Sequence, residues 1–152
     1  MITPLHLDVR QSAAGGETDF ELSLAVPSDL EYVGPAVELI AARFRTGILS
    51  PRRVRFNLRT ALAEALANAI AYGNRHDPGR QVRVWVEASR EAVRIHVTDD
   101  GDGFDPEGVP NPTLPAYLER EEGRGLFVLR SLVDDVDFNQ KGNSICLTLR
   151  AG

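Results

Sequence analysis

The sequence of 152 residues predicts an α/β (α+β) fold, a two-layer sandwich in which helices cover one face of a mixed β-sheet. Two observations predict this class. Several short segments alternate apolar and polar side chains, the period of a half-buried strand, and longer segments carry apolar residues three and four apart, the period of an amphipathic helix. Their order is strand, helix, helix, strand, strand, long loop, helix, strand, strand. Because the two early strands are too few to cover three helices, the helices are expected on one face of a larger sheet.

Cap and turn residues predict where these elements begin and end. The segment from Ser28 to Glu31 matches a capping box, in which serine and glutamate side chains each bond to a free backbone amide at a helix start. Ser50 followed by Pro51 is typical of the N-cap and first residue of a second helix. The predicted elements are a strand at 20–26, helices at 29–44 and 51–72, strands at 82–86 and 93–97, a helix that begins after Gly125, and strands at 136–138 and 145–149.

Small polar residues and prolines mark segments without regular structure. Residues 1–17 are expected to form a flexible N-terminal extension, and residues 18–152 a single domain. Within that domain, residues 105–122 contain four prolines and no strand pattern. Loops of this length inside a compact domain are usually functional, so a lid is predicted there.

Composition argues against several classes of protein. The formal net charge is −5, whereas a general nucleic-acid surface needs clustered cations, so direct nucleic-acid binding is not expected. No apolar run approaches the length of a membrane span and the first ten residues lack a secretory pattern, so we expect no membrane contact and a cytoplasmic location. The single cysteine, Cys146, excludes an intrachain disulfide and is expected to be a small core residue on the final strand.

The basic residues exclude two families of nucleotide-binding protein. Of the 17 basic residues, all but Lys141 are arginine, and Lys141 follows no glycine-rich loop. The P-loop and the eukaryotic-type protein kinase both need a phosphate-contacting lysine in a set context. A polyphosphate would therefore have to be neutralised by a cation, backbone amides and arginine.

Glu64 and Asn68 are the only polar side chains between Ala61 and Ile70. Four residues apart on a predicted helix, they project from nearly the same face. Taken alone, the pattern fits equally well a glutamate that reaches solvent at the helix edge. If the pair is buried it needs a polar partner. A magnesium ion held by the Asn68 amide oxygen, with Glu64 orienting or deprotonating an attacking hydroxyl, would supply one.

A second polar cluster, residues 99–106, directly follows a predicted strand and reads Asp-Asp-Gly-Asp-Gly-Phe-Asp-Pro. Gly101 and Gly103 let the backbone turn and let a flat ring approach closely, while Asp99 can accept a hydrogen bond from the exocyclic amine of adenine. The spacing puts no carboxylate at the first and twelfth positions of a calcium loop, which excludes that site. A plain hairpin turn stays an alternative, although prolines rather than a strand follow.

A third cluster, residues 122–126, reads Glu-Gly-Arg-Gly-Leu and precedes a predicted helix. The free amides and positive dipole at a helix start favour phosphate, and Gly123 and Gly125 would permit close approach. An ordinary transition from loop to helix is equally compatible with this pattern. The dinucleotide-binding fingerprint is excluded because Val128 occupies the place of its third glycine.

In this order and with these separations, the three clusters resemble the N-box, G1 box and G2 box of the GHKL (Bergerat) ATP-binding fold, which includes gyrase, the Hsp90 chaperones, histidine kinases and MutL. The resemblance covers about residues 20–150 and implies ATP and Mg²⁺ as cofactors. It implies that Glu64 is the catalytic carboxylate and that Asn68 ligates Mg²⁺. The other implied nucleotide contacts are Asp99, Gly101 and Gly103 at adenine, Gly123 and Gly125 at the phosphates, Arg120 or Arg124 near the γ-phosphate, and Asn143, where the wider fold commonly has threonine.

Finer features resemble the RsbW and SpoIIAB type of anti-sigma-factor serine kinases. They lie at residues 24–28, 64–68, 103–106 and 121–127, together with Arg130. Proteins of this type bind a sigma factor, phosphorylate a serine of a small STAS-type antagonist and usually form homodimers, so the resemblance implies these partners and a role in transcription regulation. Tyr72 departs from the pattern, because many relatives have histidine there, but the change removes no catalytic group.

Alternatives stay open at this point. One is an ATP-sensing module that binds a partner without phosphotransfer, against which Glu64 argues because binding alone needs no base. Another is a GHKL switch kinase for a different regulator, without sigma binding. A histidine-kinase fragment is disfavoured because His6, His76 and His96 do not lie on a suitable phosphoacceptor helix, and His96 is expected on the exposed face of its strand.

Overall fold

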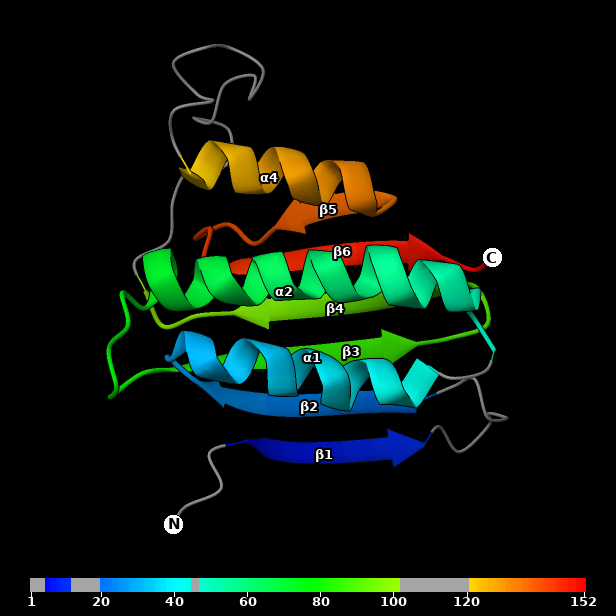
Figure 1. Ribbon diagram of the computed structural model, residues 1–152, viewed down its shortest axis with the longest axis horizontal. Coiled ribbons are helices and arrows are strands. Elements are labelled where there is room, and N and C mark those ends of the chain that lie inside the picture. Colours follow the sequence, from blue (N-terminus) through cyan, green and yellow to red (C-terminus); the bar gives the residue numbers. More distant parts are fainter. Residues whose placement is uncertain (1–4, 12–19, 45–46, 102–120) are drawn as a thin grey trace.

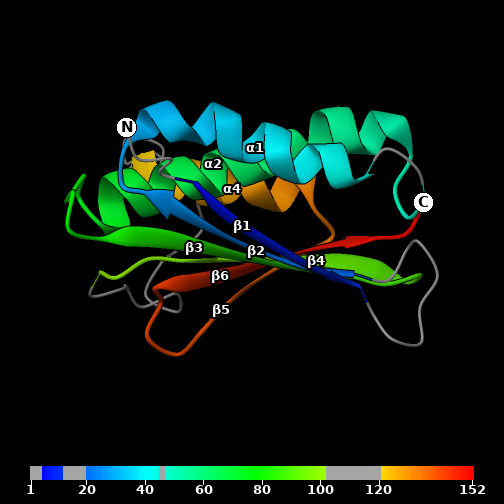
Figure 2. The same ribbon diagram turned by 90° about the horizontal axis from the view of Figure 1, so that it is seen from below.

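The computed structural model describes residues 5–11, 20–44, 47–101 and 121–152. It forms the predicted two-layer α/β (α+β) sandwich, with one β-sheet and a layer of helices on one of its faces (Figure 1 and Figure 2). The six strands lie in the order β1-β2-β3-β4-β6-β5. The elements are β1 (His6–Gln11), β2 (Phe20–Pro27), α1 (Val33–Ala41), α2 (Arg59–Asn68), β3 (Gln81–Ala88), β4 (Ala92–Thr98), α4 (Glu121–Leu132), β5 (Asp135–Phe138) and β6 (Ser144–Arg150).

All pairs of neighbouring strands in this sheet are antiparallel, whereas a mixed sheet was expected. Two antiparallel helices, α1 and the helix of residues 51–73, connect β2 to β3. A single connecting helix would bring the next strand back parallel to β2, but the second helix reverses the chain once more, so β3 is antiparallel to β2. The strands β4 and β5 do run in the same direction, but β6 is inserted between them (Figure 1). Parallel neighbours are thereby avoided, which the period of the individual strands could not reveal.

Residues 6–11 form the edge strand β1, although residues 1–17 were expected to be a flexible extension. β1 pairs with β2 along its whole length, and Val9 packs against the core. For these six residues the expectation was wrong. The small polar residues that follow were given more weight than the alternation of Leu7 and Val9 with polar neighbours.

The second predicted helix is present and is called here the long helix, residues 51–73. It begins at Pro51 as predicted, and Ser50 Oγ accepts a hydrogen bond from the backbone amide of Arg53 at 3.2 Å. After residues 51–52, the long helix consists of the π-helical segment Arg53–Leu58, then α2, then the π-helical segment Ala69–Gly73.

None of the described helices combines the length and hydrophobicity needed to cross a bilayer.

The capping box predicted at Ser28 is wrong. Asp29 is the cap instead: its carboxylate accepts a hydrogen bond from the Glu31 amide at 3.0 Å, ahead of the 3₁₀ turn Leu30–Tyr32 that leads into α1. Ser28 is buried, and its hydroxyl donates to the carbonyl oxygen of Arg80 at 2.8 Å. Because the pairing of β2 with β3 brings Arg80 to this position, the local motif could not predict the bond.

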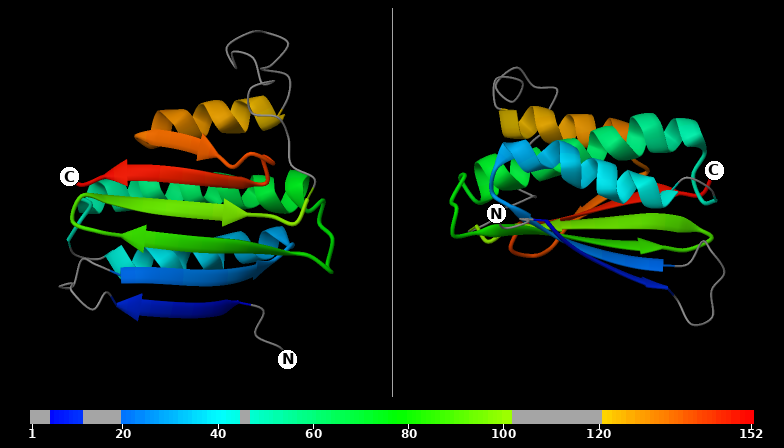
Figure 3. Two further views of the ribbon diagram at one scale, coloured as in Figure 1. Left: turned by 180° about the vertical axis from the view of Figure 1, so that it is seen from behind. Right: turned by 60° about the horizontal axis from the view of Figure 1, so that its bottom comes forward.

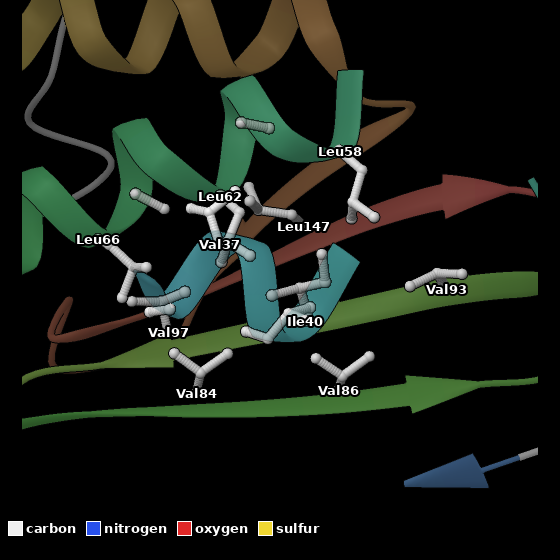
Figure 4. Packing of buried hydrophobic residues seen from close by; sticks show 14 of the residues in the cluster. Val37, Ile40, Leu58, Leu62, Leu66, Val84, Val86, Val93, Val97 and Leu147 are labelled. Carbon is white, nitrogen blue, oxygen red and sulfur yellow. The ribbon is translucent and has the colours of Figure 1, made fainter. Parts of the chain in front are cut away.

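The core lies between the sheet and the helices. In Figure 4, Leu58, Leu62 and Leu66 of the long helix point toward the strands, beside Val37 and Ile40 of α1. All five are buried, and burial of one such side chain contributes about 1.5 to 3 kcal/mol. Their partners on the strands include Val84, Val86, Val93, Val97 and Leu147.

The other face of the sheet has no helix packed on it among the described residues (Figure 3, left). Trp85 stacks on His96 there, with ring centroids 4.8 Å apart, and His96 Nε2 lies 2.9 Å from Glu87 Oε1. His96 is therefore on the outward face as expected, although it is half-buried. Cys146 is also half-buried on this face, with Sγ 3.9 Å from His96 Nε2, so the expected core position is wrong. The general burial habit of cysteine was given more weight than the alternation of β6.

Candidate functional site

One end of the sandwich, called here the motif end, brings together the elements that carry the three polar clusters. The strand β4 and the long helix both end there, and α4 and β6 both begin there (Figure 1, left side). α2 packs directly against α4. Segments far apart in sequence therefore meet at one place, because neighbouring elements run in opposite directions.

Glu64 and Asn68 lie one turn apart on α2, and both side chains are half-buried. The buried residues Leu62 and Leu66 face the sheet, so the polar pair occupies the flank of the helix. Neither side chain has a hydrogen bond or ion pair with a described residue. Asn68 lies little more than one turn before Gly73 at the motif end. Glu64 lies one turn further from that end, toward the middle of the long helix.

Asp99 is the only ionisable side chain among the described residues that is classed as buried, with 9% of its surface exposed. Its Oδ1 accepts a hydrogen bond from the Gly101 amide at 2.7 Å, while Oδ2 accepts none from a described residue. Burial raises the pKa of Asp99, and the neighbouring charge of Asp100 adds to this effect, although the Gly101 amide opposes it. The carboxylate keeps one oxygen available for a donor on a ligand, such as the adenine amine.

Two glycines let the end of the long helix touch the end of β4. A Cβ atom at Gly73 would lie 2.2 Å from Asp99 Oδ2, and a Cβ atom at Gly101 would lie 2.1 Å from the carbonyl oxygen of Gly73. A side chain at either position would displace Asp99 or the backbone. Gly101 was predicted as a glycine of close approach, and its neighbour proves to be the long helix. Gly73 directly follows the helix predicted at 51–72 and was not predicted as a site residue.

Asn74 is a structural residue of the site that sequence reasoning missed. Its side chain is fully buried. Its Oδ1 accepts a hydrogen bond from the Asp100 amide at 2.7 Å, and its Nδ2 donates to Ser28 Oγ at 2.9 Å. Asn74 therefore ties the end of the long helix to β2 and to the segment after β4. Asparagine is common in turns that follow a helix, so the sequence alone did not distinguish Asn74 from an ordinary turn residue.

Asn143 lies in the turn before β6, directly beside Asp99. Its Nδ2 donates to the carbonyl oxygen of Asp99 at 3.0 Å, and its own carbonyl oxygen accepts from the Asp99 amide at 2.9 Å. Its Oδ1 accepts from Asn139 Nδ2 at 2.7 Å. The side chain fixes the backbone that carries Asp99, and direct contact of Asn143 with a nucleotide stays a prediction.

The helix α4 begins at Glu121, although it was predicted to begin after Gly125. Gly123 therefore lies in the first turn, where backbone amides have no carbonyl partner within the helix. Glycine costs little at such a position because the turn is only partly constrained by helical bonds. The predicted site residues Gly103 and Arg120, the side chain of Arg124, and residues 105–120 of the predicted lid lie outside the described residues.

Several named proteins are similar in sequence to this chain over most of its length. Serine-protein kinase RsbW of Oceanobacillus iheyensis is 29% identical over 127 residues, which cover 79% of each chain. Serine-protein kinase RsbW of Staphylococcus aureus strain bovine RF122 is 28% identical over 140 residues, which cover 84% of each chain. The protein of the same name from strain MRSA252 matches to the same extent.

The chain also matches a domain family over most of its length, far beyond the three polar clusters. The model of the histidine kinase-like ATPase domain matches residues 26–149, from the last residues of β2 to β6. This range contains the long helix, β4, α4 and the turn before β6, which together build the motif end. On that match the chain belongs to the histidine kinase-like ATPase domain family.

Proposed function

We propose that the chain is an ATP-dependent serine protein kinase that acts as an anti-sigma factor, binding a sigma factor and phosphorylating a serine of a small STAS-type antagonist. Membership of an ATPase domain family and relatives named serine-protein kinases support the enzyme class. The observation that carries the ATP assignment is Asp99, a buried carboxylate with one oxygen that lacks a donor among the described residues. It lies at the motif end, close to the turn of α2 that bears Asn68.

The oxygen atoms of Glu64 and Asn68 suit a magnesium ion that accompanies ATP. Mg²⁺ is usually held by one or two protein oxygens, with phosphates and waters as its other ligands. Neither side chain has a hydrogen-bond partner among the described residues. When bound to Asn68, the ion would neutralise part of the triphosphate charge.

Each chain residue has a separate task in the proposed transfer. Asp99 accepts a hydrogen bond from adenine, and the free amides in the first turn of α4, which contains Gly123, donate to the phosphates, while Gly125 in the next turn permits close approach. Glu64 accepts the proton of the serine hydroxyl as the serine oxygen bonds to the γ-phosphorus. The bond from that phosphorus to the β–γ bridging oxygen breaks, and ADP leaves. Arg120 or Arg124 is proposed to meet the γ-phosphate charge.

The proposed partners follow from the relatives rather than from any contact in this chain. A protein that controls a sigma factor acts in transcription regulation, and we propose that this chain does so as a cytoplasmic homodimer. A pull-down from the native cell, with and without ATP, would test the partners. Recovery of a sigma factor together with a small serine-containing antagonist is the expected result. Recovery of an unrelated regulator would favour a switch kinase that does not bind sigma.

The catalytic assignment is tested by Glu64→Gln, with Glu91→Gln in the exposed β3–β4 turn as the matched control. With the recovered antagonist as substrate and labelled ATP, Glu64→Gln is expected to bind ATP normally and to transfer phosphate roughly 10²- to 10⁴-fold more slowly, because it lacks the base. The control should match the unsubstituted protein. Equal transfer by Glu64→Gln would refute the base. Normal ATP binding with no transfer by any variant would favour an ATP-sensing module.

A further inference from the structure

The first turns of the long helix present two arginines and a phenylalanine to solvent. Arg52, Arg55 and Phe56 are all exposed, and the exposed fraction of Phe56, 56%, exceeds that of every other large hydrophobic side chain among the described residues. The guanidinium carbon of Arg55 lies 5.7 Å from the centroid of the Phe56 ring. Arg52 is three and four residues before the other two, so it lies on the same helix face. These three residues are called the arginine stripe.

The arginines of the stripe lack the carboxylate partners that their helical neighbours have. Arg53 donates to Asp134 Oδ2 at 3.0 Å, and Arg59 pairs with Glu38 on α1. Arg52 and Arg55 have no ion pair with a described residue. Other arginines of the described residues also lack an ion pair, but Arg52 and Arg55 lie beside the most exposed aromatic ring of this part of the chain, in a protein whose formal net charge is −5.

The position of these arginines is unfavourable for the isolated protein. A helix start carries the positive end of the helix dipole, where acidic side chains stabilise and basic ones destabilise. Arg52 and Arg55 occupy the first turns after Pro51, and Arg55 lies in a π-helical segment. π-Helical turns are rare and frequently occur at functional sites. Residues that destabilise the isolated protein, such as basic side chains at a helix start, are expected where a surface binds a partner.

We propose that the arginine stripe is the docking site for an acidic, amphipathic segment of a partner protein. Its carboxylates would pair with Arg52 and Arg55, and one of its apolar side chains would cover the Phe56 ring. Arginine and aromatic side chains are enriched in the energetically dominant parts of protein interfaces. A protein segment fits better than nucleic acid because an exposed phenylalanine at the centre calls for an apolar contact, and the chain as a whole is acidic.

The stripe and the motif end lie at opposite ends of the long helix. The helix begins at the side of the molecule where the C-terminus is marked in Figure 1 and ends at the other side, next to Asp99. A partner held at the stripe therefore lies at the far end of the long helix from Asp99. The proposal goes beyond the nucleotide site and can fail or succeed independently of it.

The test uses the full chain and a defined probe, a labelled synthetic helical peptide with glutamates on one face and leucines on the other. Its binding is measured by fluorescence anisotropy for the unsubstituted protein, for Arg52→Glu with Arg55→Glu, and for Phe56→Ala. Arg90→Glu, at an exposed arginine in the β3–β4 turn, is the matched control. Two further probes are a leucine-free peptide of the same charge and single-stranded DNA.

We expect the amphipathic peptide to bind, and both stripe variants to weaken its binding about tenfold or more, as loss of a dominant interface residue does. The control should bind normally, and affinity should fall with added salt. The double charge reversal should also raise the melting temperature, because it places acidic side chains at the helix start. No binding of the peptide, equal binding by the variants, equal binding of the leucine-free peptide, preference for DNA, or a change of oligomeric state in Phe56→Ala would each overturn the proposal.

Discussion

Asp99 and Asp100 are adjacent at the end of β4, yet their surroundings shift their pKa values in opposite directions. Burial raises the pKa of Asp99, as described above. Partial burial would also raise the pKa of Asp100, but hydrogen bonds from Arg83 and from the Gln81 amide outweigh it and lower the pKa. Asp100 therefore anchors the segment to β3, while Asp99 is kept at a cost to the fold.

Replacing Asp99 by asparagine is expected to stabilise the protein at neutral pH. The folded state favours the protonated carboxyl, so the contribution of Asp99 to stability is fully present below its ordinary pKa of 3.8 and is lost as pH rises through the raised value. Asp99→Asn removes the buried charge and keeps an acceptor for the Gly101 amide. Denaturant titrations should give it a higher free energy of unfolding than the unsubstituted protein at neutral pH and no advantage in acid. ATP binding should fall, because the amide is a poorer acceptor for adenine.

Asp100→Asn is the control with the opposite sign. The lowered pKa means that the Asp100 carboxylate stabilises the fold above its ordinary pKa and loses this effect as pH falls through the lowered value. Asp100→Asn should therefore be less stable than the unsubstituted protein at neutral pH. If Asp99→Asn also proved less stable there, the account of Asp99 as a buried, destabilising charge would be wrong.

At the scale of residues, sequence reasoning found the side chains that stand out from their neighbours. Glu64 and Asn68 interrupt an apolar helix, and Asp99 ends an apolar strand, so each was visible as a local anomaly. Asn74 and Ser28 were not visible. Their role depends on a hydrogen bond between positions 46 apart in sequence, which only the packed elements bring together.

At the scale of elements, β1 has the clearest consequence for stability. It covers the edge of β2 and lays Val9 against the core. Removing residues 1–11 should lower the free energy of unfolding by roughly 1 kcal/mol, because Val9 is half-buried and full burial of a valine contributes about 1.5 kcal/mol. It should also cause light scattering that grows with protein concentration, because the bare edge of β2 can pair with another chain. Removal of residues 1–4 alone is the control, and equal stability of the two truncations would contradict this role of β1.

Periodicity predicted every element whose apolar face is long enough to be read, including the long helix and the hairpin of β3 and β4. It failed at the short edge strand, where only Leu7 and Val9 alternate with polar residues. It also placed the start of α4 too late, because glycines were taken to exclude a helix. In the first turn few helical bonds have formed, so Gly123 is tolerated there.

At the scale of the whole molecule, ligand binding at the motif end should stabilise the fold, since it ties α2, β4 and α4 together. Mg²⁺ and ATP at one hundred times the dissociation constant should add about 2.7 kcal/mol to the free energy of unfolding. For a chain of this size that corresponds to roughly 5 to 10 °C in melting temperature by thermal-shift measurement. Asn68→Ala should lose the part of the shift that depends on Mg²⁺, with ATP plus chelator as the reference. An equal Mg²⁺-dependent shift in Asn68→Ala would refute its role as ligand.

The layer arrangement was predictable because apolar stripes on helices and strands can be buried only against each other. The antiparallel strand order was not predictable, because nothing in the sequence of β6 indicates that it lies between β4 and β5. Strand neighbours are decided by how the connecting helices run, which is a property of the assembled chain.

The insertion of β6 also bears on synthesis at the ribosome. Asn143 holds the backbone of Asp99 across 44 positions of sequence, so β4 emerges with a bare edge and waits for α4 and β5 to be made before its second neighbour arrives. A nascent chain halted within α4 carries Glu64, Asn68 and Asp99, but Asp99 still lacks the two hydrogen bonds that Asn143 makes to its backbone. Competence to hold nucleotide should therefore appear abruptly as β6 leaves the exit tunnel, after the side chains that would bind it have already emerged.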